Sequence, residues 1–253
     1  MKNTDLLFYN EYESFYEMAS KSKAFCNFCE DAFGKDFSQD GFSDINQINR
    51  ILEYIPKNSI ANVLDIGCGN GKMLEYLQQK TNANIYGFDY SKNAINNANK
   101  LKLDNSEFRI GLIGEIKYPK NKFDVIISMD TIYFANDIKD FVSQVKSWLK
   151  PDGVFFIGYQ EGDVIPKTEN VETTQISRAL IKNDMSYEAF DITEETYNLL
   201  RKKRASAILH KNRFEEENNI QWYDMLIAQT EYSECIYEEF KKKMSRYIFV
   251  ARK

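Results

Sequence analysis

The sequence predicts an α/β protein whose parallel sheet is covered by helices on both faces. Between residues 60 and 160, short apolar segments alternate with segments whose apolar residues recur every three or four positions. Only short turns separate them, and this alternation is typical of parallel strands joined by crossover helices. The chain has 253 residues, 43% of them hydrophobic and 28% charged. This composition supplies enough apolar material for one large core and argues against a disordered chain.

Residues 1–58 precede this alternating stretch and predict helices. Apolar and aromatic residues recur at helical spacing over 8–19 and again over 45–55. The segment 33–42 contains two glycines, breaks the helical pattern and should form a loop. Pro56 should end the last of these helices. We expect this stretch to form a helical lid beside the core.

The alternating stretch contains five apolar segments that predict strands and three periodic segments that predict helices. The predicted strands are residues 61–66, 84–89, 107–112, 123–129 and 154–159. The predicted helices are residues 72–80, 91–101 and 137–149, with Ser91 capping the second. The turn Lys-Pro-Asp-Gly at 150–153 should lead into the fifth strand.

The last third of the chain is less regular. We expect a helix near 173–183, a strand at 186–192, a long helical stretch over 193–244 and a closing strand at 246–251. The predicted organisation is a helical lid over 1–58, a core over 59–192 and 245–253, and a helical cap inserted over 193–244.

Charge and composition exclude several classes of partner. The formal net charge of −5 disfavours nucleic acid. No apolar run reaches the roughly 20 residues that a membrane helix needs, and the N-terminus lacks the pattern of a secretory signal. Four cysteines without a ligand framework fit reduced thiols, so we expect a cytoplasmic protein with no metal site. The single histidine, His210, lies in a segment rich in Lys and Arg and is expected to be a solvated surface residue.

One segment carries the chemistry: residues 63–72 read Val-Leu-Asp-Ile-Gly-Cys-Gly-Asn-Gly-Lys. An acid at a strand end is followed by three alternate glycines and a helix N-terminus, so a ligand can approach the backbone and its free N–H groups. The dinucleotide fingerprint needs glycine at the position of Lys72. A phosphate-binding P-loop needs glycine at Ile66 and Ser or Thr at Met73. Both interpretations fail.

The segment resembles motif I, Asp-x-Gly-x-Gly-x-Gly, of the class I S-adenosylmethionine-dependent methyltransferases. Asp89 ends the second predicted strand 22 residues after Gly67, where an acid can bind ribose hydroxyls. Residues 123–134 and the turn 149–153 match further parts of the family pattern in the same order. The resemblance covers residues 60–160. It implies a Rossmann-like seven-stranded sheet with an antiparallel last strand, S-adenosyl-L-methionine as cofactor and S-adenosyl-L-homocysteine as product.

The resemblance also implies which residues contact the cofactor. Asp65 would lie near the methionine ammonium, and Asp89 would hold the ribose. Many relatives have an acid at the position of Leu112 that binds the adenine amino group, so adenine recognition here would fall to the backbone of Leu112 and Ile113 or to Glu115. The other implied cofactor contacts are Gly67, Cys68, Gly69, Gly71, Tyr90 and Met129.

The absence of two motifs narrows the class of molecule that can accept the methyl group. The chain has no Pro-Pro pair after the fourth predicted strand, as amino-directed nucleic-acid methylases have, and no Pro-Cys nucleophile, as cytosine methylases have. We therefore expect a small-molecule acceptor, with N-methylation ahead of O-methylation. A protein or RNA methyltransferase, or a catalytically silent S-adenosylmethionine-binding partner protein, are the alternatives. The oligomeric state stays open.

Two candidate catalytic residues, Asp130 and Tyr133, follow the fourth predicted strand. The resemblance places Asp130 near the transferred methyl group and Tyr133 where many small-molecule enzymes have a His or an aromatic residue facing the acceptor. The loop 38–42 resembles the lid sequence of small-molecule methyltransferases, and aromatic residues of the cap would suit a cationic amine or a flat ring. The expected acceptor contacts are Tyr16, Gln39, Phe42, Tyr133 and Trp222.

Overall fold

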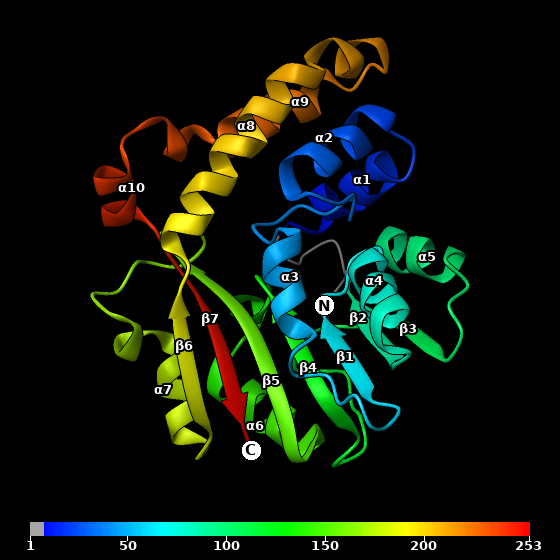
Figure 1. The fold of residues 1–253 in the computed structure, drawn as a ribbon, viewed down its shortest axis with the longest axis vertical. Helices are drawn as coiled ribbons and strands as arrows, with labels where there is room; N and C mark the ends of the chain where they lie inside the picture. Colours follow the sequence, from blue (N-terminus) through cyan, green and yellow to red (C-terminus); the bar gives the residue numbers. More distant parts are fainter. Residues whose placement is uncertain (1–7) are drawn as a thin grey trace.

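The computed structural model describes residues 8–253, and its centre is a seven-stranded sheet in the order β3-β2-β1-β4-β5-β7-β6 (Figure 1). Strands β1 to β5 pair in parallel, whereas β7 runs antiparallel to both of its neighbours. The strands are β1 (Asn62–Ile66), β2 (Asn84–Asp89), β3 (Ser106–Ile110), β4 (Phe123–Met129), β5 (Leu149–Glu161), β6 (Ser186–Asp191) and β7 (Ser245–Arg252). This arrangement confirms the predicted fold class.

Ten α-helices surround the sheet in residues 8–253. They are α1 (Tyr9–Ala19), α2 (Lys23–Phe33), α3 (Ile45–Ile51), α4 (Lys72–Thr81), α5 (Lys92–Lys100), α6 (Ile138–Trp148), α7 (Gln175–Lys182), α8 (Thr193–Glu216), α9 (Ile220–Gln229) and α10 (Tyr237–Lys243). Several begin where a short polar side chain caps the first turn. Ser91 Oγ accepts a hydrogen bond from the Ala94 N–H at the start of α5, as the sequence predicts.

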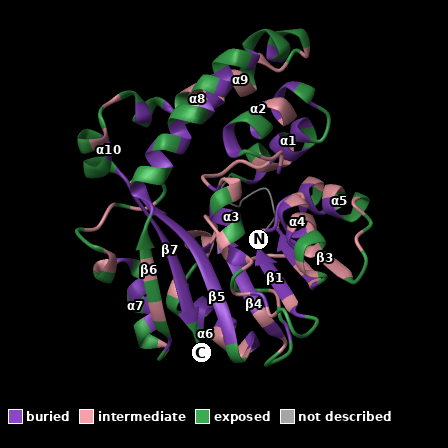
Figure 2. Ribbon diagram, in the orientation of Figure 1, coloured by how far each residue is buried: buried purple, intermediate pink, exposed green. Residues whose placement is uncertain are grey.

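Two apolar clusters hold helices on the two faces of the sheet. On one face, α6 and α7 contribute Trp148 and Leu180 to the core. On the other face, α3, α4 and α5 contribute Ile48, Leu77 and Ile95. The central strands are buried along almost their whole length (Figure 2). This explains why their sequences are continuous apolar runs, because both faces of each strand are covered.

A third cluster joins the helical lid to the cap. Helices α1, α2, α8 and α9 lie beyond the carboxyl ends of the parallel strands (Figure 1). There, Phe15 and Phe28 of α1 and α2 pack in one cluster with Leu199 and Phe214 of α8. None of the helices in the described part of the chain is long and apolar enough to cross a membrane.

The packing of α2 against α8 corrects the expected surface position of His210. This side chain is only 9% exposed, and its Nε2 lies 2.7 Å from the Asp31 carboxylate on α2. In the same helix, Lys203 is 1% exposed, although it belongs to a basic run expected to face solvent. The charged composition of this segment suggested exposure to solvent, but α8 is covered by α2, α9 and α10.

Candidate functional site

A cavity of about 470 Å³ lies at the carboxyl edge of the sheet. The ends of β1, β2 and β4 form its floor, and the helical lid covers it. The sheet order reverses between β1 and β4, and open α/β sheets bind ligands at such a point. The floor residues include Asp65 near the end of β1, Gly67 just after β1, Asp89 at the end of β2 and Met129 at the end of β4.

The glycine loop brings its backbone to the cavity. Gly67 and Gly69 have φ angles of +72° and +54°, a region that favours glycine. A Cβ atom on Gly67 would lie 2.5 Å from the Thr131 methyl, and one on Gly69 would lie 2.5 Å from the Tyr16 hydroxyl. Gly71 instead caps α4 and does not line the cavity. At these two positions the backbone itself therefore faces the cavity.

Two buried carboxylates stand beside this loop. The oxygens of Asp89 accept hydrogen bonds from the Gly69 N–H (3.0 Å) and the Ser91 N–H (2.8 Å). Burial raises the pKa of Asp89 to about 6. Burial, together with the nearby charge of Asp89, raises the pKa of Asp65. An ammonium or sulfonium group and ribose hydroxyls would offset the cost of burying these charges, so the residues fit S-adenosylmethionine.

Helix α1 forms the roof of the cavity and is attached to α5. Glu13 Oε1 accepts hydrogen bonds from Ser91 Oγ (2.6 Å) and from the Asn93 N–H (3.2 Å) at the start of α5. Asn97 Nδ2 donates to the Tyr16 carbonyl (2.9 Å). These contacts place the Tyr16 ring above the glycine loop.

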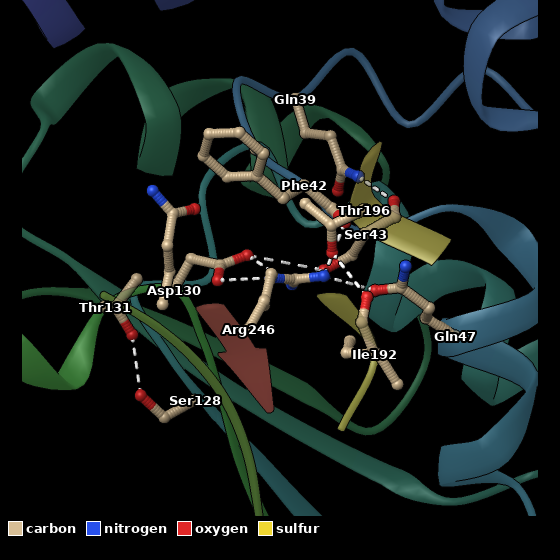
Figure 3. Close-up of polar contacts among 12 residues, drawn as sticks. Gln39, Phe42, Ser43, Gln47, Ser128, Asp130, Thr131, Ile192, Thr196 and Arg246 are labelled. Carbon is tan, nitrogen blue, oxygen red and sulfur yellow. Dashed lines mark hydrogen bonds and ion pairs between the residues drawn. The ribbon is translucent and has the colours of Figure 1, made fainter. Parts of the chain in front are cut away.

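Arg246 of β7 connects the lid to the end of β4 (Figure 3). It is fully buried, and its guanidinium donates from Nε to Asp130 Oδ1 (3.0 Å) and from Nη2 to Asp130 Oδ2 (2.7 Å). Nη2 also donates to Ser43 Oγ (2.9 Å). Nη1 donates to the Phe42 carbonyl (2.6 Å) and to Gln47 Oε1 (2.5 Å). All five N–H groups of the guanidinium therefore have partners.

Residues 57–231 match a family model described as a methyltransferase domain, which is more than half of the chain. The chain belongs to the methyltransferase family. This membership confirms the predicted methyltransferase family.

Known relatives support the same family over part of their length. Phosphoethanolamine N-methyltransferase of Plasmodium falciparum is 34% identical over 130 residues, 49% of this chain and 48% of that protein. Human arginine-hydroxylase NDUFAF5 is 28% identical over 114 residues, 44% of this chain and 32% of that protein. The methyltransferase thus spans about half or less of these relatives.

A solved structure shows a similar fold over nearly the whole chain. Phosphoethanolamine N-methyltransferase 2 of Haemonchus contortus superposes with a TM-score of 0.75 at 21% identity, covering 95% of this chain and 59% of that one. At this identity the likeness concerns the fold.

Most residues expected at the site line the cavity of the methyltransferase. Those that line it are Tyr16, Gln39, Asp65, Gly67, Cys68, Gly69, Asp89, Tyr90, Leu112, Ile113, Met129, Asp130 and Tyr133. Three expected residues do not line the cavity: Gly71, Phe42 and Trp222. Trp222 packs with its ring 5.9 Å from Phe15 in the cluster of lid and cap, and Phe42 packs against α8 and α10.

Sequence reasoning missed several residues of the site. Tyr12 and Asp40 line the cavity from the lid, and Phe134 lines it from the loop after β4. Sequence reasoning also missed Arg246. Its position at the start of the apolar closing strand was a signal, because a charged residue beside a buried run needs a partner. Among residues 8–253, no group of three or more His, Cys, Asp or Glu side chains could hold a metal ion.

Proposed function

We propose that the methyltransferase transfers a methyl group from S-adenosyl-L-methionine to a small-molecule acceptor, at nitrogen in preference to oxygen. The observation that carries the proposal is the partial covering of the cavity by the lid. Tyr12, Tyr16 and the segment 39–43 cover it, and Lys203 of α8 donates a hydrogen bond to the Gly41 carbonyl from behind (3.1 Å). A cavity of about 470 Å³ that also holds the cofactor leaves space for a compact acceptor.

The groups around the cavity support nitrogen as the nucleophile. Burial raises the pKa of the Tyr12, Tyr16 and Tyr133 phenols, so these hydroxyls stay protonated at neutral pH. No histidine lines the cavity within the described residues. Carboxylates are then the strongest bases in the lining, and a carboxylate or water takes the proton of an ammonium far more readily than that of an alcohol, so the lining suits an amine better than a hydroxyl.

The cofactor, when bound, supplies the methyl group as a sulfonium. A neutral acceptor nitrogen forms the new N–C bond while the C–S bond breaks, and the electron pair passes to sulfur. The chain's own contribution is to orient the acceptor and exclude water, because catalysis of an in-line displacement can come largely from positioning.

A labelling experiment tests this function. Methyl-labelled S-adenosylmethionine is incubated with the protein and with a cell extract separated into small molecules, protein and RNA. We expect label in the small-molecule fraction, with mass spectrometry placing the methyl group on nitrogen. A Gly67→Val variant, whose side chain would collide with Thr131, is the inactive control. Label in protein or RNA alone would contradict the proposal.

A further inference from the structure

We propose that the acceptor is an organic amine that carries no phosphate group, recognised as an ammonium by Asp40 and the rings of Tyr12 and Tyr133. This inference rests on the proposed function. It departs from the name of the Plasmodium falciparum relative, a phosphoethanolamine N-methyltransferase.

The charges that line the cavity are the first argument. Within the described part of the chain, its lining includes no lysine, arginine or histidine, but it includes five carboxylic acids. Asp65 and Asp89 lie on the floor expected to hold the cofactor. Asp40 and Asp130 lie in the remaining space, beside the lid. A phosphate dianion placed there would face carboxylates without a counter-charge, and burying such a charge is costly.

The nearest cations are already engaged. Each N–H group of Arg246 is bound to Asp130, Ser43, Phe42 or Gln47, so none is free for a ligand. Arg246 also neutralises Asp130, which leaves Asp40 as the carboxylate of this space without a direct ion pair among the described residues.

Lys203 approaches from behind the lid and does not line the cavity. It is 1% exposed, its Nζ donates to the Gly41 carbonyl, and it lies 5.6 Å and 5.2 Å from the ring centres of Phe33 and Phe42. Beside its ammonium group stand these two aromatic rings and the lid backbone, and it also attracts the Asp40 carboxylate. Lys203 therefore offers no open phosphate site.

Asp40 is arranged to receive a cation. Its carboxylate accepts hydrogen bonds from Gln229 Nε2 (3.1 and 3.3 Å), and the buried Lys203 ammonium attracts it but forms no direct ion pair with it among residues 8–253. Asp40 and Tyr12 both line the cavity, and the Asp40 charge, after burial, raises the pKa of the Tyr12 phenol. Aromatic faces beside a carboxylate stabilise an ammonium through cation–π and ionic attraction. The proton must leave before transfer, and water or Asp40 can accept it.

Two matched probes test the inference without requiring turnover. Choline and phosphocholine share a quaternary ammonium that cannot be methylated, and they differ only by the phosphate. We expect calorimetry on the protein saturated with S-adenosyl-L-homocysteine to show choline binding at least ~10-fold more tightly. Tighter binding of phosphocholine, or no binding of either choline or tetramethylammonium, would overturn the inference.

A substitution tests whether Asp40 recognises the ammonium group. Asp40→Asn should weaken choline binding by about tenfold or more, because a charged partner is lost, while leaving the affinity for S-adenosyl-L-homocysteine unchanged. Asp104→Asn removes the same charge from an exposed position outside the cavity and should change neither affinity. Equal choline affinity in wild type and Asp40→Asn would overturn the assignment. The labelling experiment above is independent of these results, so a failure here is distinguishable from a failure of methyl transfer.

Discussion

The contact between Gly69 and Tyr16 shows how single atoms define the cofactor end of the cavity. The Tyr16 hydroxyl occupies the space that a Cβ on Gly69 would need, 2.5 Å away, and the next ring atom is 3.2 Å away. The lid therefore rests directly on the glycine loop. A side chain at position 69 must displace either the loop or α1.

Substituting this glycine tests the contact. We expect Gly69→Ala to lower the affinity for S-adenosyl-L-homocysteine at least ~10-fold, because the new methyl group collides with the hydroxyl and a φ of +54° is strained for alanine. Adding Tyr16→Phe removes the colliding oxygen and should restore part of the loss. Calorimetry measures both effects.

The chain offers a control for backbone strain alone. Gly114 has a φ of +89°, and a Cβ atom there would meet no other atom within 4 Å, so Gly114→Ala carries the strain without the collision. Its neighbours Ile113 and Glu115 line the cavity, so the loss compared is that of the free energy of unfolding. An equal loss of unfolding free energy in Gly69→Ala and Gly114→Ala, or no recovery of affinity in the double variant, would contradict the steric account.

At the scale of elements, Arg246 fastens three parts of the fold together. It extends from β7 to the end of β4 and to the lid segment that leads into α3. Removing one partner of a buried ion pair is more damaging than replacing both, because the other charge remains buried and unpaired.

We expect Arg246→Met to reduce the free energy of unfolding by about 3–5 kcal/mol, measured by urea denaturation. Arg246→Met combined with Asp130→Asn should recover part of this loss, since no unpaired charge remains. Arg252→Met, at the exposed end of the same strand, is the control and should change stability little. The account is wrong if both arginine variants lose the same stability.

The elements also show where sequence reasoning succeeds. Strands β2 and β4 have the predicted bounds, because continuous apolar runs between turn residues define a buried parallel strand locally. Strand β5 instead begins at Leu149, which pairs with Phe123, so the residues interpreted as a Pro-Gly turn belong to the strand. Pairing with a distant segment decided that boundary.

The residues of the site likewise divide into those that local sequence predicts and those that it does not. The glycine loop and Asp89 were predictable because both lie in one strand-helix-strand unit, over residues 62–89. Arg246 lies 116 residues after Asp130, and Asp40 faces Gln229 from the far end of the chain, so only the tertiary fold brings them together. The expected role of Trp222 depended on the path of α9, which local periodicity does not determine.

For the whole molecule, the buried acids of the cavity couple stability to pH. The folded protein raises the pKa of Asp89 from 3.8 to about 6, so the folded state binds this proton more tightly than the unfolded state. The Asp89 contribution to the free energy of unfolding therefore falls by about 3 kcal/mol as pH rises from about 4 to about 6. Asp65, with a raised pKa, acts in the same direction.

We expect Asp89→Asn to flatten this part of the stability profile. Urea unfolding of the cofactor-free protein at about pH 4.5, 5.5 and 6.5 would show wild-type stability falling relative to the variant as pH rises. Wild-type affinity for S-adenosyl-L-homocysteine should rise over the same interval, because the ionised carboxylate accepts hydroxyl hydrogen bonds more strongly. Parallel stability profiles for the two proteins would show that Asp89 titrates normally.

The central claim is that one cavity at the carboxyl edge of the sheet, covered by the lid, holds the cofactor against the acceptor. The most direct measurement is calorimetric titration of S-adenosyl-L-homocysteine into wild type, Asp89→Ala and the exposed control Asp104→Ala. We predict that wild type and Asp104→Ala bind equally, and that Asp89→Ala loses at least ~10-fold in affinity. Unchanged binding by a folded Asp89→Ala variant would contradict the placement of the cofactor in this cavity.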